Sequence, residues 1–372
     1  MNPRKGTETA CRCECVVRQF FDVGMVKVVS YNRKVVFYLS ILYVSDPEAK
    51  IAFIENRVVA NYADGMQQSF PVEGVESITL LTKVQISTKC MEQCLKRGIP
   101  VAFFSKDGHY FGRLVSTGHV NAALQRRQSM LYDTSFSLEL SRRLIAAKIK
   151  NQLVVMRRYA RSKEADLKKL EEKIYSFYKK VSHLDTIEEI MGYEGQCAKL
   201  YFQGLSLCID TEFAFKGRSR RPPRNPFNSL ISLGYSVLMN EIYNEIETKG
   251  LNPYFGFMHR DAENHPTLAS DMLEEWRAVL IDSMAMSLIN GHEMSWEHFF
   301  MGDDEPPGCY LTKDGLRIFL KKLEKKLQVR AKYLPYVTNQ VTFRRAIALQ
   351  LGRLTEAIKE GEAGIYEPIT IR

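Results

Sequence analysis

The sequence predicts an α+β protein, with a small N-terminal β domain followed by a larger all-α domain. Between residues 35 and 117 the apolar residues form short runs separated by turn signals, a pattern typical of strands. From residue 118 onward the apolar period is that of helices. The chain has 372 residues, enough for two domains, since one domain commonly takes about 100–200 residues. We therefore expect a β domain over 35–117 and an α-helical domain over 118–372.

The first strand of the β domain is expected in VVFYLSILYV at 35–44, an apolar run too short to span a bilayer. IAFIEN and RVVANYADG predict a hairpin, and VESITLL predicts a further strand. STKCMEQCLKRG predicts a helix that ends at Gly98. IPVAFFSKDGHYFGRLV predicts a second hairpin that turns at Asp107 and Gly108.

The helical domain is expected to contain a series of long helices without an internal repeat. In chain order the expected segments are VNAALQRRQSMLYD, SLELSRRLIAAKIKNQLVVMRRYAR, LKKLEEKIYSFYKKV, DTIEEIMGYEGQCAKLYFQGL, NSLISLGYSVLMNEIYNEIETKG, TLASDMLEEWRAVLIDSMAMSLING, LTKDGLRIFLKKLEKKLQ and FRRAIALQLGRLTEAIKEG.

The chain is basic, with a formal charge of +9 and a pI near 9.0. This balance favours polyanionic partners, nucleic acid first and an anionic membrane surface second. The sequence shows neither a signal-peptide pattern nor a membrane-spanning run, so we expect a cytoplasmic protein that does not insert into membranes. Residues 1–34 have no clear pattern and are interpreted as an extension, in which Met25 is a candidate natural start.

Eight cysteines are scattered along the chain rather than grouped in a secreted disulfide framework. Cys11, Cys13 and Cys15 lie close together but form no CxxC pair and have no nearby histidine. Free thiols are therefore favoured over a metal site at these three positions. Cys90 and Cys94 are spaced i, i+4 in an expected helix and are predicted to be buried apolar residues.

Glu194 is the first candidate for a functional acid. It lies in the middle of an expected helix, between Gly192 and Gly195, and Asp185 is the expected N-cap of that helix. Each glycine costs about 1 kcal/mol relative to alanine. We interpret the helix as one that lets another group approach its backbone beside Glu194. The alternative is a solvated glutamate next to a close helix contact.

The second candidate region is GFMHRDAENHPTLASDMLEEWR at 256–277. Thr267 is an expected helix cap, and the helix dipole alone favours acids in the first turns. Asp271 and Glu274 are spaced i, i+3 and therefore share one helix face. Together with His259 they would make a site of two carboxylates and one imidazole, which suits Mg²⁺ or Mn²⁺. Spacing alone leaves open whether these separate segments meet, and a lone histidine is most often structural.

A basic loop, GRSRRPPRNPFN at 217–228, is stiffened by three prolines and contains no acidic residue. Guanidinium groups in such a loop are suited to contacts with phosphates, although an ordinary solvated loop has the same composition. The candidate DNA-binding residues are Arg218, Arg220, Arg221 and Arg224.

These segments together resemble the family of the CRISPR adaptation integrase, the metal-dependent subunit that inserts new spacers into a CRISPR array. The resemblance runs in order over roughly 35–372 and is most specific in GYEGQCAKLYF and in GLNPYFGFMH followed by LASDMLEEWR. RRPPRNPFNSLISLGYSVL is similar to the Pro-Pro-x-Asp-Pro-x-Asn segment of the family, with Asn225 in place of the aspartate. The loop AENHPT also departs from the family, which has a Gly-Arg-rich loop there.

The resemblance implies that Glu194, His259 and Glu274 bind Mg²⁺ or Mn²⁺ and that Asp271 is a neighbouring acid that either ligates or orients. It also implies a reaction, the attack of a protospacer 3′ hydroxyl on a phosphodiester of the CRISPR repeat, by transesterification without a covalent enzyme intermediate. His259 has an alternative role, protonation of the leaving 3′ oxygen.

The partners implied by the resemblance are double-stranded DNA, a second copy of the chain, and a small adaptation partner dimer, in a heterohexamer-like complex of a prokaryotic cytoplasm. The β domain at 35–117 is expected to make the homodimer contact and to help dock the small partner. Two other functions stay open: a structure-specific endonuclease acting on branched repair intermediates, and a non-catalytic DNA-binding scaffold.

Overall fold

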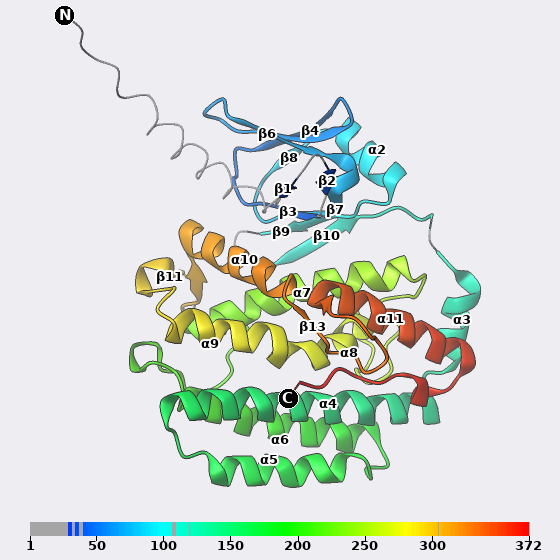
Figure 1. The fold of residues 1–372 in the computed structure, drawn as a ribbon, viewed down its shortest axis with the longest axis vertical. Coiled ribbons are helices and arrows are strands. Elements are labelled where there is room, and N and C mark those ends of the chain that lie inside the picture. The colour runs from blue at the N-terminus through cyan, green and yellow to red at the C-terminus, as the bar shows by residue number, and fades with distance from the viewer. Residues whose placement is uncertain are drawn as a thin grey trace, which may run out of the picture. The chain divides into compact units, whose positions relative to one another are not determined.

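The computed structural model describes residues 29–31, 34–36, 40–105, 109–118, 120–303 and 305–371. The chain divides into two compact units, Met1–Gly118 and His119–Arg372, whose elements are labelled in Figure 1. The predictions for Cys11, Cys13, Cys15 and Met25, and for the turn at Asp107 and Gly108, lie outside the described residues.

The described residues of unit 1 form two four-stranded sheets. In the first, β3 (Ser40–Val44), β7 (Val75–Leu80) and β9 (Val101–Phe104) are parallel, and β10 (Tyr110–Leu114) is antiparallel to β9. In the second, β4 (Lys50–Ile54), β5 (Arg57–Asn61) and β6 (Gln67–Pro71) form an antiparallel meander, and β8 (Gln85–Ile86) is parallel to β4. A further pair, β1 (Val29–Tyr31) with β2 (Lys34–Val36), shows that β structure begins before residue 35.

Local sequence signals account for several elements of unit 1. The predicted β4–β5 hairpin is present and turns at Glu55 and Asn56, which both have positive φ, as a two-residue hairpin turn requires. The predicted helix is α2 (Thr88–Arg97), which begins with a Ser87 cap and ends at Gly98 in the left-handed conformation. One hydrophobic core joins residues of both sheets with the buried cysteines of α2.

Unit 2 is built mainly from helices. They are α3 (Ala122–Met130), α4 (Ser135–Lys163), α5 (Lys168–Val181), α6 (Ile187–Ser206), α7 (Pro226–Thr248), α8 (Thr267–Trp276), α9 (Ser283–Asn290), α10 (Lys313–Leu327) and α11 (Phe343–Glu360). The unit also contains two short antiparallel strand pairs, β11 (Phe299–Met301) with β12 (Cys309–Leu311) and β13 (Arg330–Ala331) with β14 (Val341–Thr342). The predicted α+β class is confirmed, although unit 2 is not purely helical.

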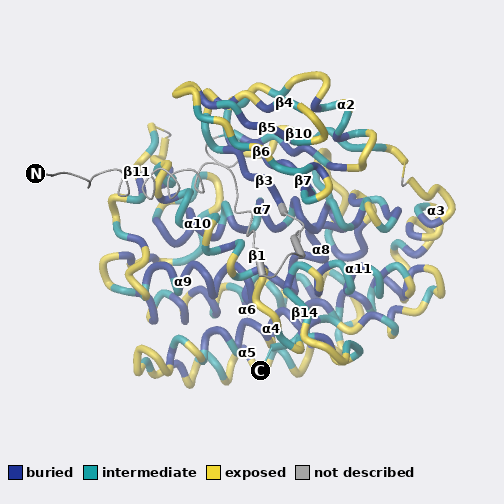
Figure 2. Tube along the Cα trace, turned by 45° about the horizontal axis from the view of Figure 1, so that its top comes forward, coloured by how far each residue is buried: buried dark blue, intermediate teal, exposed yellow. Residues whose placement is uncertain are grey.

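Helix α8 lies in the interior of unit 2. It packs against α4 and α7, while α4 packs against α5 and α6 on its other side (Figure 1). Every residue of α8 is buried, as the dark tube of Figure 2 shows, whereas α5 exposes one face. The acids of α8 are therefore core residues, and the helix dipole alone does not account for carboxylates in such a place.

Two predicted helix caps are wrong. The N-cap of α6 is Thr186, which forms a capping box with Glu189, so Asp185 lies outside the helix. The N-cap of α8 is Pro266, and the hydroxyl of Thr267 instead donates to the carbonyl of Tyr254.

The segment TLASDMLEEWRAVLIDSMAMSLING is not one continuous α-helix. A π-helical turn, Arg277–Asp282, separates α8 from α9. π-turns often mark functional sites, and this one directly follows the segment that carries Asp271 and Glu274. No helix among the described residues is long and apolar enough to cross a membrane.

Candidate metal-binding active site

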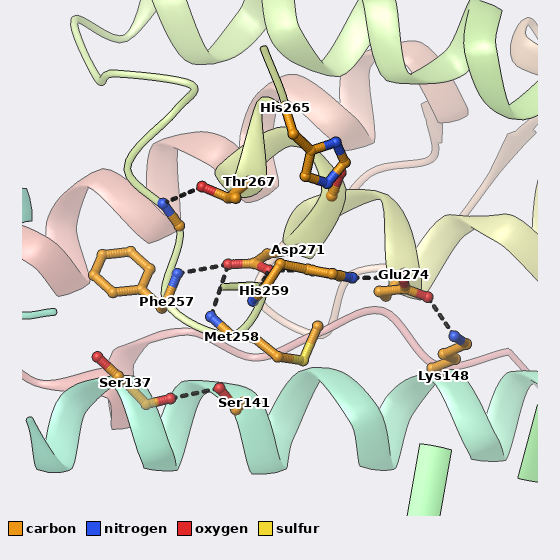
Figure 3. A network of polar contacts seen from close by, with 12 residues as sticks. Ser137, Ser141, Lys148, Phe257, Met258, His259, His265, Thr267, Asp271 and Glu274 are labelled. Carbon is orange, nitrogen blue, oxygen red and sulfur yellow. Dashed lines mark hydrogen bonds and ion pairs between the residues drawn. The ribbon is translucent and has the colours of Figure 1, made fainter. Parts of the chain in front are cut away.

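Three segments that are far apart in the sequence meet at the ammonium group of Lys148 on α4. Lys148 forms one ion pair with Glu194 of α6 and another with Glu274 of α8, the latter with an Nζ–Oε2 distance of 2.5 Å. His259 precedes α8, and its Nε2 lies 3.8 Å from Oε1 of Glu274. Figure 3 shows Lys148 and His259 on either side of Glu274. The structure thus brings together Glu194, His259 and Glu274.

Asp271 holds the histidine segment in place. Its Oδ2 accepts hydrogen bonds from the backbone N–H groups of Phe257 (2.6 Å) and Met258 (3.1 Å). Its Oδ1 accepts from the backbone N–H of His259 (3.0 Å) and lies 2.6 Å from Nδ1 of the same residue (Figure 3). Both oxygens of this fully buried carboxylate are therefore engaged, and Nδ1 is the imidazole nitrogen that donates to it.

The turn before His259 depends on a close approach between Gly256 and Thr267. A Cβ at Gly256 would lie 2.7 Å from Cβ of Thr267, and the N–H of Gly256 donates to the Thr267 hydroxyl at 2.9 Å. Phe257 is buried and packs edge-on against the ring of Phe136 on α4. The Gly-Phe sequence thus fixes the path by which the backbone reaches His259.

Charges around Glu274 shift the pKa values of the site. Burial raises the pKa of Glu274, but Arg277 (3.2 Å), Lys148 and His259 outweigh burial and lower it to about 2. For His259, burial opposes protonation, yet the hydrogen bond and charge of Asp271 and the charge of Glu274 raise its pKa. Glu274 is therefore an anion at neutral pH, and the imidazole binds protons more readily than an ordinary histidine.

The site has the chemistry of a divalent-cation site. Among the described residues, no three His, Cys, Asp or Glu side chains form a group that could hold a metal ion as they stand. The Lys148 ammonium, however, already places a cation between the two glutamates. Two carboxylates and one imidazole are donors that Mg²⁺ and Mn²⁺ accept. The donor types therefore fit such an ion, and Lys148 occupies the space between the two glutamates.

A second buried acid, Asp282, lies at the end of the π-turn. Its Oδ2 accepts from the hydroxyl of Tyr201 at 3.0 Å, and its Oδ1 accepts from that of Tyr235. Burial raises the pKa of Asp282 to about 6, against the opposing effect of these donors and of nearby arginines. The guanidinium groups of Arg277 and Arg218 lie over the Tyr235 ring, 5.0 and 5.6 Å from its centroid.

The four arginines of the basic loop do not have the same environment. Arg218 is half-buried and donates to Asn228 Oδ1 (2.9 Å) and Ser232 Oγ (3.1 Å) of α7. Arg220, Arg221 and Arg224 are exposed. The pKa of His265 is lowered by burial and, to a smaller extent, by neighbouring charges that include Arg221. The basic loop therefore lies near the segment between His259 and α8.

The two glycines beside Glu194 face open space. Apart from the backbone of its own helix, a Cβ added to Gly192 or Gly195 would meet no described protein atom within 4 Å, and both residues are exposed. A close contact with another helix is therefore not what these glycines accommodate.

Sequence reasoning missed Lys148 and Arg277. Lys148 lies on the buried stripe of α4, at helical spacing from Leu144, Ile145 and Gln152. A lysine within an apolar stripe could have indicated a nearby acid, because a buried lysine needs an anionic partner. Arg277 offered a weaker signal, since it follows Glu274 by three residues.

Comparison with known proteins identifies the family. The family model described as CRISPR associated protein Cas1 matches residues 42–325. A CRISPR-associated endonuclease Cas1 of Mycobacterium tuberculosis is 34% identical over 325 residues, which are 86% of this chain and 94% of that protein.

Two solved structures have the same fold. One is a Cas6-RT-Cas1–Cas2 complex (TM-score 0.77, 20% identity), in which the match covers 91% of this chain and 37% of the other. The other is a casposase bound to integration product (TM-score 0.77, 18% identity), with coverage of 87% and 91%. The chain therefore belongs to the family of CRISPR-associated protein Cas1, the spacer-acquisition integrase, as the segments around Glu194, His259 and Glu274 had implied.

Proposed function

We propose that this chain joins the 3′-hydroxyl ends of protospacer DNA to a CRISPR repeat, at a site formed by Glu194, His259 and Glu274. The observation that carries the proposal is that, in a member of the Cas1 family, the Lys148 ammonium pairs with both Glu194 and Glu274 while Nε2 of His259 lies 3.8 Å from Glu274. In the reaction the attacking oxygen forms a bond to phosphorus and the bond to the leaving 3′ oxygen breaks. The attacking hydroxyl loses a proton, and the leaving oxygen gains one.

Glu194, Glu274 and Nε2 of His259 would hold a Mg²⁺ or Mn²⁺ ion, which when bound supplies positive charge to the scissile phosphate. Asp271 fixes the imidazole through Nδ1, so that Nε2 faces Glu274. The raised pKa of His259 also supports its alternative role as proton donor to the leaving oxygen. Asp271 is assigned to orientation rather than ligation, because both of its oxygens already accept hydrogen bonds.

The function is tested with purified protein, its small partner, Mn²⁺, a labelled short duplex and a supercoiled plasmid containing a repeat. An integrase transfers the label covalently to the plasmid, and duplexes with 3′-deoxy ends do not react. A structure-specific endonuclease nicks the plasmid or a branched substrate without transferring label. A scaffold does neither, with or without EDTA. Label transfer that persists in EDTA contradicts the metal dependence, and nicking alone contradicts the integrase.

We further propose that the exposed arginines of the loop, Arg220, Arg221 and Arg224, bind DNA phosphates. Each phosphate contact on duplex DNA contributes about −0.9 to the slope of log affinity against log salt. Replacing these three residues by alanine is expected to flatten the slope for any DNA sequence, as measured by fluorescence anisotropy. Arg218→Ala is expected to lower stability and leave the slope unchanged, because Arg218 bonds within the protein. An unchanged slope in the triple variant would assign the loop to solvent or to a protein interface.

We propose that the open face at Gly192 and Gly195 receives the DNA backbone. Gly195→Ala is expected to stabilise the fold by up to about 1 kcal/mol, since the new Cβ meets no described protein atom. It is expected to weaken DNA binding about tenfold, since small steric clashes commonly cost 1–3 kcal/mol. Gly352→Ala, in the open middle of α11, is the matched control and is expected to stabilise without affecting DNA. Equal DNA affinity in both variants would place the DNA elsewhere.

We propose that unit 1 makes the homodimer contact and helps to dock a small partner of the Cas2 kind. The Cas1–Cas2 complex among the structures of similar fold supports such a partner. A shortened chain beginning at residue 119 is expected to be monomeric and inactive in joining, while it keeps its helical circular dichroism and some DNA binding. Size-exclusion chromatography with light scattering measures the assembly. A dimer that survives the truncation would assign dimerisation to the helical unit.

A further inference from the structure

Lys148 has no role in the chemistry described so far, yet it contacts both glutamates of the site. Its side chain is only 4% exposed, and its ion pairs among the described residues are with Glu194 and Glu274. Those two acids belong to different helices, α6 and α8. Lys148 is therefore the link that holds the two carboxylates at one point.

We propose that Lys148 is a positioning residue that acts as an internal counter-ion: it holds Glu194 and Glu274 together before a divalent ion binds, and it competes with that ion for them. This inference rests on the proposed assignment of the two glutamates as metal ligands. It assigns to Lys148 the control of metal affinity, in addition to any contribution to the stability of the fold.

The charge balance of the site supports competition. Two cations, Lys148 and Arg277, face two anions, Glu194 and Glu274. The carboxylate of Asp271 is already engaged by His259 and by three backbone N–H groups. A divalent ion that entered while Lys148 stayed in place would meet two glutamates whose charges Lys148 and Arg277 already balance. Repulsion between two cations is strong at contact distance in a weakly polar interior. The ammonium must therefore move away from the glutamates for the divalent ion to bind tightly.

The side chain of Lys148 is suited to such a movement. It is a point charge on a flexible four-carbon stem, whereas a guanidinium would hold both carboxylates in a rigid fork. Its stem lies on the buried stripe of α4 next to Leu144 and Ile145, which fixes the backbone from which the ammonium reaches the glutamates. The ammonium can therefore change its position without any shift of α4.

The test is Lys148→Met, which keeps the length and the apolar stem but removes the charge. Mn²⁺ binding is followed at pH 8 by the electron paramagnetic resonance signal of the free ion, and the melting temperature is measured without metal. We expect the metal-free melting temperature to fall, because two carboxylates are left without their shared cation. We expect Mn²⁺ to bind about tenfold more tightly, because one positive charge at contact distance no longer opposes it.

A merely structural lysine would behave differently, since its loss would lower stability and metal affinity together. Lys163→Met is the matched control, because Lys163 lies on the same helix and pairs with Asp210 away from the site. It is expected to leave Mn²⁺ affinity unchanged. Should Lys148→Met not fold, Lys148→Gln tests the same loss of charge with a polar side chain, and Lys148→Arg, which keeps the charge, is expected to bind Mn²⁺ no more tightly than the wild type.

Mn²⁺ affinity equal to or below that of the wild type in the folded neutral variants would overturn the proposal. Failure of the metal site itself is recognised separately in the same titration. Glu194→Gln and Glu274→Gln are expected to weaken Mn²⁺ binding strongly. If they bind Mn²⁺ as the wild type does, the ligand assignment is wrong, and the inference about Lys148 falls with it.

Discussion

Replacing either Glu194 or Glu274 by glutamine is expected to abolish DNA joining. Glutamine keeps the shape of the side chain but removes the negative charge that a divalent ion requires. The two variants should differ in stability, because Glu274 is 3% exposed and Glu194 is 17% exposed. The lowered pKa of Glu274, about 2, means that the fold favours its ionised form. Replacing Glu274 is therefore expected to lower the free energy of unfolding by about 3 kcal/mol.

The pH dependence of Glu274 has a defined sign. Because its pKa is lowered in the fold, its contribution to stability is present above pH 4.5 and is lost as the pH falls toward about 2. Denaturant unfolding of the wild type should show this loss, and that of Glu274→Gln should lack it. A difference between the two proteins that does not change with pH in this range would contradict the electrostatic account.

The joining assay and the melting temperature are measured on the same samples. Glu324→Gln is the control, because Glu324 is an acid about as buried as Glu194 that pairs with Arg344 at 2.8 Å in another part of the unit. It is expected to lose stability and to keep joining. Full joining activity in Glu194→Gln or Glu274→Gln would remove that residue from the site.

Replacing Asp271 by alanine is expected to have a comparably large effect through a different cause. The change leaves three consecutive backbone N–H groups and Nδ1 of His259 without their acceptor in a fully buried place. Breaking such a buried network commonly costs about 3–5 kcal/mol. Loss of the carboxylate that orients a ligating histidine commonly weakens metal binding about 10–100-fold. We therefore expect a lower free energy of unfolding and weaker Mn²⁺ binding together.

Asp271→Asn separates orientation from ligation. Asparagine keeps one acceptor oxygen, so an orienting role predicts partial metal affinity, intermediate between the wild type and Glu274→Gln, in the Mn²⁺ titration. Asp282→Asn is the control, since it alters another fully buried acid of the same helical run, one that bonds to Tyr201 and Tyr235. It is expected to reduce stability and leave Mn²⁺ binding intact. If Asp271→Asn loses metal binding as completely as Glu274→Gln does, Asp271 is itself a ligand.

The sequence by itself determined the features that depend on local interactions. The β4–β5 hairpin, the helix that ends at Gly98 and the long helices of unit 2 follow from apolar period, turn residues and caps, all of which act within a few residues. The family was also recognisable from the segments around Glu194, His259 and Glu274, because these residues stand at characteristic spacings within each segment.

Only the tertiary structure decided how those segments meet. Lys148 lies 46 residues before Glu194 in the chain, and no period or cap indicates that α4 and α8 pack so that its ammonium lies between two acids. The same packing buries α8 completely, commits Asp271 to the turn before His259, and directs Arg218 into the protein while Arg220 and Arg221 stay exposed. These outcomes depend on which helix faces are in contact, and contacts between distant segments are set by the packing of the whole unit rather than by local sequence.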